Sequence, residues 1–139
     1  SLDTIITTEW SGEQMEAAAW LRNNAKPTDL VATNLTLSPF VAATTHLPTY
    51  ISAIQYQFDY GTSNMRSEVL KRESDVWAFI SSPGHETLQP LCEAGVKWIW
   101  VDLARTEQAD WAPFLQLTFR NSAVSVLTAD SAYCTARTR

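Results

Sequence analysis

Polar residues follow the ends of several predicted strands, and their types suit the binding of a small ligand. Asn34 comes directly after the apolar run "LVAT", and Asp102 comes directly after "WIWV". Ligands of open α/β sheets bind at the carboxyl ends of the strands, so Asn34 and Asp102 are candidate ligand-binding residues. Asp59 and Tyr60 end an aromatic, turn-like stretch and could lie at the same edge. The competing interpretation is structural, with Asp102 capping a helix or pairing with Arg105.

His46 is a lone histidine just before the predicted strand "PTYIS". An imidazole there could act as a base or contact a ligand, so His46 is also a candidate ligand-binding residue. The sequence has no G-x-S-x-G elbow to provide a serine nucleophile for it. A loop histidine that bonds the nearby backbone is the simpler interpretation. We expect no catalytic residue in this chain.

The glycines exclude the common phosphate-binding loops. Only four occur, at positions 12, 61, 84 and 95. A dinucleotide fingerprint or a P-loop needs glycines a few residues apart, and none of these four is that close to another. We therefore expect no nucleotide cofactor.

The charge of the chain argues against a nucleic-acid partner, and its hydropathy argues against a membrane-spanning segment within it. The net charge is −5 over 139 residues, and the basic residues are scattered, which argues against nucleic-acid binding. No apolar run approaches the roughly 20 residues of a membrane span, and no signal peptide is visible. The sequence begins "SLDT" without Met, so we expect a processed or excised piece of a larger protein.

Two cysteines, Cys92 and Cys134, leave two interpretations open. A zinc site is not expected, because His46 and His85 show no ligand spacing relative to them. The cysteines could be two unrelated buried thiols. They could also form one disulfide that ties the C-terminal segment to a helix, which would imply an oxidising compartment.

Hydrophobic periodicity and turn signals predict alternating helices and strands. We expect helices near 11–24, from Ser38-Pro39, over 63–80 and over 87–95, a partly helical stretch near 106–119, and strands over 29–33, 48–52, 96–102 and 123–129. Such alternation predicts a single α/β domain over residues 1–139. We expect a three-layer Rossmann-like or flavodoxin-like domain with a small, mostly parallel sheet.

Several segments, taken in order, match a known arrangement. They are "AAAWLRNNAKPTDLVATN", "ATTHLPTYIS", "QFDYG", the helix ending "VWAFI", "LCEAGVKWIWVD" and "FLQLTFRNSAVSVL". Together they resemble the soluble C-terminal domain of multi-pass GT-C type glycosyltransferases, which use polyprenyl-phosphate sugars, and of related uncharacterised bacterial membrane proteins. One departure is His46-Leu47, where such tails often carry Gly-Arg.

The resemblance implies a location and a role. The domain would lie on the extracytoplasmic face of the cell membrane, anchored through the parent protein, which is compatible with a Cys92–Cys134 disulfide. Its partners would be the membrane-embedded part of the same polypeptide and possibly a glycan or a polyprenyl-linked sugar. The family's catalytic carboxylates lie in loops between membrane helices, so none can be assigned here. The resemblance therefore implies a non-catalytic accessory domain.

Two alternatives stay open beside that function. The chain could be a stand-alone ligand-binding or enzymatic α/β domain with its site at the carboxyl edge of the strands. It could also be an interaction module whose contact patch includes exposed tryptophans, for example Trp10 and Trp111.

Overall fold

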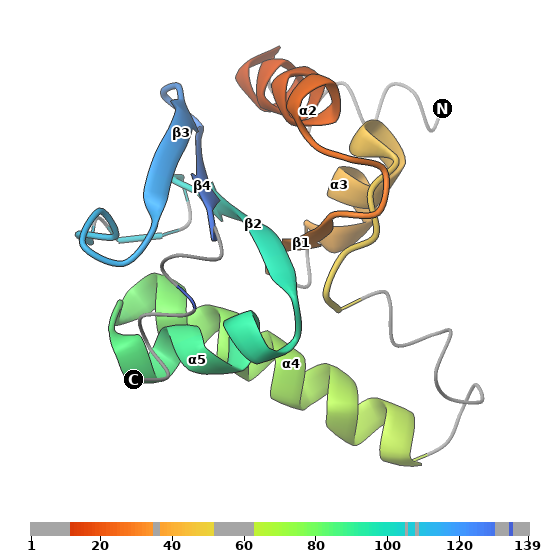
Figure 1. Cartoon of the computed structure of the whole chain (residues 1–139). Coiled ribbons are helices and arrows are strands. Elements are labelled where there is room, and N and C mark those ends of the chain that lie inside the picture. Colours follow the sequence, from red (N-terminus) through yellow and green to blue (C-terminus); the bar gives the residue numbers. More distant parts are fainter. Residues whose placement is uncertain are drawn as a thin grey trace.

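The chain folds into four helices and four strands over the part described in the computed structural model (Figure 1), namely residues 12–34, 37–51, 63–104, 106–107, 109–129 and 134. The helices are α2 (Gly12–Asn24), α3 (Ser38–Thr45), α4 (Ser63–Ser81) and α5 (His85–Glu93). The strands are β1 (Leu30–Ala32), β2 (Val96–Asp102), β3 (Gln116–Arg120) and β4 (Val124–Thr128). The α/β class expected from the sequence is confirmed.

The four strands form one mixed sheet in the order β1-β2-β4-β3. β1 pairs with β2 in parallel, whereas β4 is antiparallel to both β2 and β3. Thr49 adds an isolated parallel bridge to Val31 on the free side of β1, where the sequence predicted a strand over 48–52. The expectation of a mostly parallel sheet is therefore not confirmed.

The antiparallel part arises from a hairpin that we expected to be partly helical. Residues 116–120 form β3, and the chain turns at Asn121 to run back as β4. The Oδ1 atom of Asn121 accepts the amide hydrogens of Ala123 and Val124, both at 2.9 Å, which fixes this turn. The alternation of Leu115, Leu117 and Phe119 has the two-residue period of a strand, and Pro113 lies before it rather than within it.

The helices and strands with the clearest sequence patterns lie where the sequence predicted them. α4 extends to Ser81, one residue beyond its predicted end, and β2 matches its prediction. α3 begins at Ser38 with a proline in its first turn, where no amide hydrogen is needed. Gly95 follows α5 with a φ of 83°, a conformation that glycine adopts without steric cost.

Two details of the helices differ from expectation. α5 starts at His85 rather than after Thr87, whose hydroxyl instead donates back to the carbonyl of Gly84 at 3.1 Å. The sequence pattern places Met15, Ala18, Ala19 and Arg22 on one face of α2. The buried residues are instead Gln14, Ala17, Ala18 and Leu21. Alanines on both sides of α2 made the two faces hard to distinguish by sequence.

Helices cover both faces of the sheet (Figure 1). One core cluster joins α2 and α3 to Trp98 and Trp100 of β2. The other joins α4 and α5 to Ile99 and Val101 of the same strand. Successive side chains of a strand point to opposite faces, so β2 contributes to both clusters in turn.

A matched pair of leucines tests this division between core and surface. Leu21 of α2 is 0% exposed and Leu70 of α4 is 61% exposed, and both lie inside helices. We expect Leu21→Ala to lower the free energy of unfolding by about 3 kcal/mol, because it leaves a cavity in the α2–α3 side of the core. We expect Leu70→Ala to change it by less than about 0.5 kcal/mol. Urea denaturation of both variants measures this, and equal losses would contradict the described packing of α2.

Candidate functional site

β1 and β2 are parallel and run toward the same edge of the sheet. Ala32, the last residue of β1, pairs with Ile99, and β2 continues for three further residues to Asp102. Asn34 follows β1 and Asp102 ends β2, so both belong to the carboxyl-end side of this strand pair, and a shared ligand site stays a prediction. Asp102 ends β2 and is only 3% exposed, and its Oδ1 atom accepts the amide hydrogen of Ala104 at 3.1 Å. A buried carboxylate at a strand end is the most polar group that this edge offers.

Asn34 has a structural role at this edge. Its Oδ1 atom accepts the amide hydrogen of Leu37 at 3.0 Å, and its carbonyl oxygen accepts hydrogen bonds from the backbone and side chain of Ser38, both at 3.1 Å. These bonds close the turn that leads from β1 into α3. A ligand contact by Asn34 would have to use the remaining amide group, and it stays a prediction.

His46 lies at the opposite end of α3 from Asn34. It follows the last residue of the helix with a φ of 61° and a ψ of 22°, and its backbone amide donates to the carbonyl of Ala42. Its side chain is exposed. The eight residues of α3 span roughly 12 Å. The structure therefore separates His46 from Asn34 and Asp102.

The other predicted contact residues have mixed outcomes. Asp59, Tyr60 and Trp10 lie outside the described residues. Trp111 is only 5% exposed, and its indole N–H donates to the carbonyl of Ile80 at 2.9 Å, so the prediction that Trp111 is an exposed contact residue is wrong. Trp77, half of whose surface is exposed, was not singled out from the sequence.

Two buried polar groups at the strand edge lack a partner among the described residues. They are the hydroxyl of Thr33, which is 1% exposed, and the indole N–H of Trp100, also 1% exposed. Continuing the register from Ala32 and Ile99 places Thr33 beside Trp100. A buried donor without a hydrogen bond costs about 1–3 kcal/mol, so this pair is an uncommon feature.

A polar cluster holds the segment after Thr49 against α4. The guanidinium of Arg72 donates to the carbonyl of Tyr50 at 2.7 Å and lies 4.8 Å from the centroid of its ring. The Nε atom of Arg72 also pairs with Glu68 at 3.0 Å. Asp75 accepts a 3.0 Å bond from Lys71 and lies 3.5 Å from the Tyr50 hydroxyl. Arg72 is a charged residue within the apolar stripe of α4 that includes Val76 and Phe79, and this cluster explains its position.

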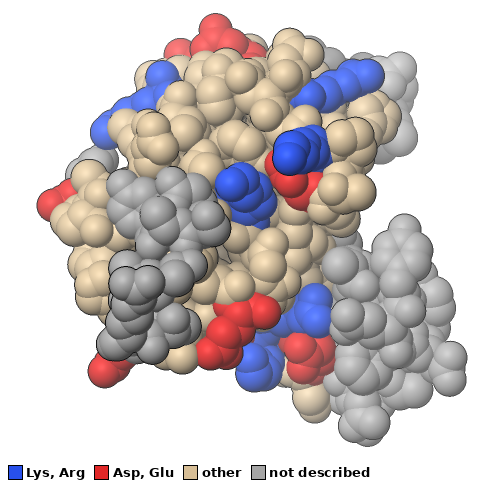
Figure 2. All heavy atoms as spheres, in the orientation of Figure 1, with Lys and Arg blue, Asp and Glu red and all other residues tan. Residues whose placement is uncertain are grey.

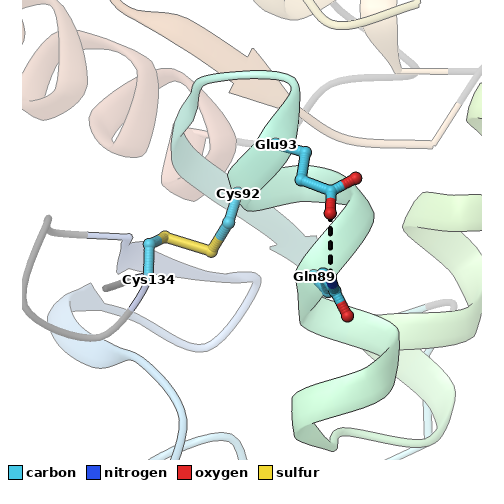
Figure 3. The surroundings of a disulfide bond; sticks show 4 residues. All are labelled: Gln89, Cys92, Glu93 and Cys134. Carbon is cyan, nitrogen blue, oxygen red and sulfur yellow. Dashed lines mark hydrogen bonds between the residues drawn. A yellow bond between two sulfur atoms is a disulfide. The ribbon is translucent and has the colours of Figure 1, made fainter. Parts of the chain in front are cut away.

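Cys92 and Cys134 form a disulfide (Figure 3), with 5.6 Å between their Cα atoms. Of the two interpretations left open by the sequence, the disulfide is confirmed. It joins the last turns of α5 to a residue 42 positions further along the chain. In the same part of α5 the side chain of Gln89 donates to Glu93 at 2.8 Å. The disulfide therefore holds Cys134 to the α4–α5 side of the sheet.

The surface in Figure 2 shows basic and acidic side chains lying among one another, with uncharged residues over most of that face. Within the described ranges, no group of three or more histidine, cysteine or acidic residues could hold a metal ion. No helix in that part of the chain is both long enough and apolar enough to span a membrane.

Comparison of the chain with protein-family models, curated proteins and solved structures found no match. The family resemblance therefore continues to rest on the motifs themselves.

Loss of the disulfide is expected to destabilise the domain strongly. In the chain-entropy model, a bond across 42 residues stabilises the folded state by about 4 kcal/mol. We expect Cys92→Ser/Cys134→Ser to lower the melting temperature by roughly 10 °C. Calorimetry with and without a reductant measures this. The double variant should be insensitive to reductant, whereas a wild type that is equally insensitive would contradict a stabilising bond.

The Tyr50 cluster predicts a pH dependence at the alkaline end. Burial raises the pKa of Tyr50 above 10.0, and the Asp75 carboxylate raises it further. Because the pKa is higher in the folded state, this stabilisation is complete below about pH 10 and is lost as the pH rises through the folded pKa. We expect the stability of Tyr50→Phe to fall less steeply above pH 10 than that of the wild type. Denaturation at pH 9 to 11.5 gives the slopes, and equal slopes would contradict the prediction.

Proposed function

We propose that this chain is a non-catalytic, extracytoplasmic accessory domain of a membrane glycosyltransferase-like protein. The observation that carries its location is the Cys92–Cys134 disulfide. Disulfides form and persist in oxidising environments and are rare in the cytosol. The accessory role is supported by the order of the motifs that resemble the extracytoplasmic tails of GT-C type enzymes.

Within that role, the carboxyl edge of β1 and β2 is the part best suited to contact a glycan or the membrane-embedded part of the polypeptide. A carboxylate that accepts and an amide that can donate are groups that bind sugar hydroxyls. Asp102 and Asn34 provide these two groups at one edge. Sugar contact by this edge is part of the proposal.

We also propose that the fold is a three-layer, Rossmann-like variant. Helices on both faces of the sheet and the parallel pair of β1 and β2 support this assignment. The β3–β4 hairpin would then be an antiparallel extension at one side of the sheet, as mixed α/β sheets often carry.

The location can be tested by labelling the parent protein in intact cells with a membrane-impermeant maleimide. Thr28 is exposed and Thr49 is 0% exposed, so Thr28→Cys and Thr49→Cys form a matched pair. The native cysteines are bonded and should not react. We expect labelling of Thr28→Cys without permeabilisation and little labelling of Thr49→Cys before denaturation. Labelling of Thr28→Cys only after lysis would refute an extracytoplasmic location.

The accessory role needs a separate measurement, namely sugar transfer by membranes that contain the parent protein. Deletion of residues 1–139 should lower transfer to the acceptor, while the membrane part still binds its polyprenyl-phosphate sugar. Unchanged transfer after deletion would refute the accessory role. Asp102→Asn removes the charge and keeps the size, so it tests the strand edge with little change in packing.

A stand-alone ligand-binding domain is the second candidate function, and the strand edge favours it. Asp102 lies two residues after Trp100 in β2, and the buried donors of Thr33 and Trp100 lack partners among the described residues. Cell fractionation distinguishes the two functions. Recovery of the protein free of membranes would support the stand-alone domain, and recovery with membranes would support the accessory domain.

A further inference from the structure

α4 carries an exposed face that no other described helix or strand covers. Leu70 is 61% exposed and Trp77 is 50% exposed, which is unusual for two large apolar side chains on one helix. We define the α4 outer face as the exposed residues among the described side chains of this helix, residues 66–81, which are Arg66, Ser67, Leu70, Lys71, Ser74, Trp77 and Ser81. Figure 1 shows α4 along the lower side of the molecule, with the sheet above it.

These seven residues form one continuous surface. At 100° per residue they fall within an arc of roughly 140° around the helix. Leu70 and Trp77 are seven positions apart and therefore lie almost in line along the axis. The serines between and beside them are small, so they leave both apolar side chains free to reach a flat partner.

The charges of the α4 outer face are all of one sign. Arg66 and Lys71 are exposed on it. The half-buried Glu68 and Asp75 lie roughly 40° or more beyond the arc, and the half-buried Glu73 borders it, about 20° beyond Arg66. Lys71 pairs with Asp75 at 3.0 Å, but its side chain remains 62% exposed. The chain as a whole has a net charge of −5, so a face whose exposed charges are both cationic differs from the average of the chain, although the carboxylates of Asp75 and Glu73 border it.

We propose that the α4 outer face lies on the anionic surface of a lipid bilayer. Trp77 and Leu70 would enter the headgroup region, where tryptophan is enriched, and Arg66 and Lys71 would contact lipid phosphates. A stable protein partner normally buries roughly 800 Å² per side and about 20–30 residues, far more than seven residues provide. Adsorption to a bilayer needs only a few such groups.

This proposal rests on the proposed location beside a membrane, and it adds the surface through which the domain would contact that membrane. A basic residue near an anionic bilayer raises the partition coefficient roughly fivefold, so two of them and two apolar side chains give weak adsorption. Weak adsorption suffices for a domain that is already tethered through its own polypeptide, because the tether supplies a high effective concentration.

Vesicle sedimentation tests the proposal with the 139-residue chain. The probes are large unilamellar vesicles of phosphatidylcholine with about 30% phosphatidylglycerol, and vesicles of phosphatidylcholine alone. We expect binding to the anionic vesicles that weakens as salt rises, and at least tenfold weaker binding to the neutral ones. We expect Leu70→Ser/Trp77→Ser to lower the partition coefficient at least tenfold, and Arg66→Gln/Lys71→Gln to lower it about tenfold.

Matched controls keep the test specific to this face. Met15 and Leu117 are each 46% exposed on other elements, so Met15→Ser/Leu117→Ser removes comparable apolar surface elsewhere. Arg22→Gln/Lys26→Gln removes two exposed cations away from α4. Both controls should bind anionic vesicles as the wild type does. Circular dichroism and urea denaturation confirm that each variant is folded.

Three results would overturn the proposal. They are no binding to anionic vesicles, equal binding by Leu70→Ser/Trp77→Ser and the wild type, and a wild-type dimer in analytical ultracentrifugation that this variant abolishes. The last would assign the face to a second copy of the chain. Maleimide labelling is independent of all three, so an extracytoplasmic location could stand while membrane docking by α4 fails. If the wild type binds anionic vesicles but Thr28→Cys is labelled only after lysis, membrane docking by α4 is supported and the extracytoplasmic location is refuted.

Discussion

The structure depends on β2, a strand whose two faces are both buried. Trp98 and Trp100 pack against α2 and α3, while Ile99 and Val101 pack against α4 and α5. A strand with this pattern is stable only if other elements cover both of its faces and both of its edges. β1 and β4 pair with its edges, and the helices cover its faces. The burial of Asp102 follows from this arrangement, because the strand ends before it leaves the core.

The two tryptophans of β2 show how the start and the end of the strand differ. At the start, the indole N–H of Trp98 donates to Asp29 at 2.9 Å, and the same carboxylate oxygen accepts the amide hydrogen of Lys26. That shared acceptor fixes the turn from which β1 begins. At the other end, the indole N–H of Trp100 has no partner within the described part of the chain. The indole near the start of the strand is therefore hydrogen-bonded to the turn before β1, whereas the indole near its end packs edge-on against Phe40.

The sequence predicted the elements whose signals are local. α4 and β2 have uninterrupted periodicity, and Ser38-Pro39 marks the start of α3. The topology was harder, because the choice between helix and strand over residues 106–119 depended on a short alternating run after Pro113. The contacts between distant positions, around Tyr50 and between the cysteines, were harder still to predict. Arg72 bonds the carbonyl of Tyr50 across 22 positions, and the Cys92–Cys134 pair spans 42, so neither contact leaves a spacing signal along the chain.

α4 connects the strand edge to the outside of the domain. Arg72 lies on the side of α4 opposite its outer face, since it is about 180° from Ser81 around the helix. There it bonds the carbonyl of Tyr50, which follows the parallel bridge between Thr49 and β1. A bilayer in contact with the outer face would therefore be linked, through one helix and one guanidinium, to the segment beside the carboxyl end of β1. The α4 outer face and the strand edge share no residue. Docking of the α4 outer face would nevertheless set the distance between the strand edge and the lipid.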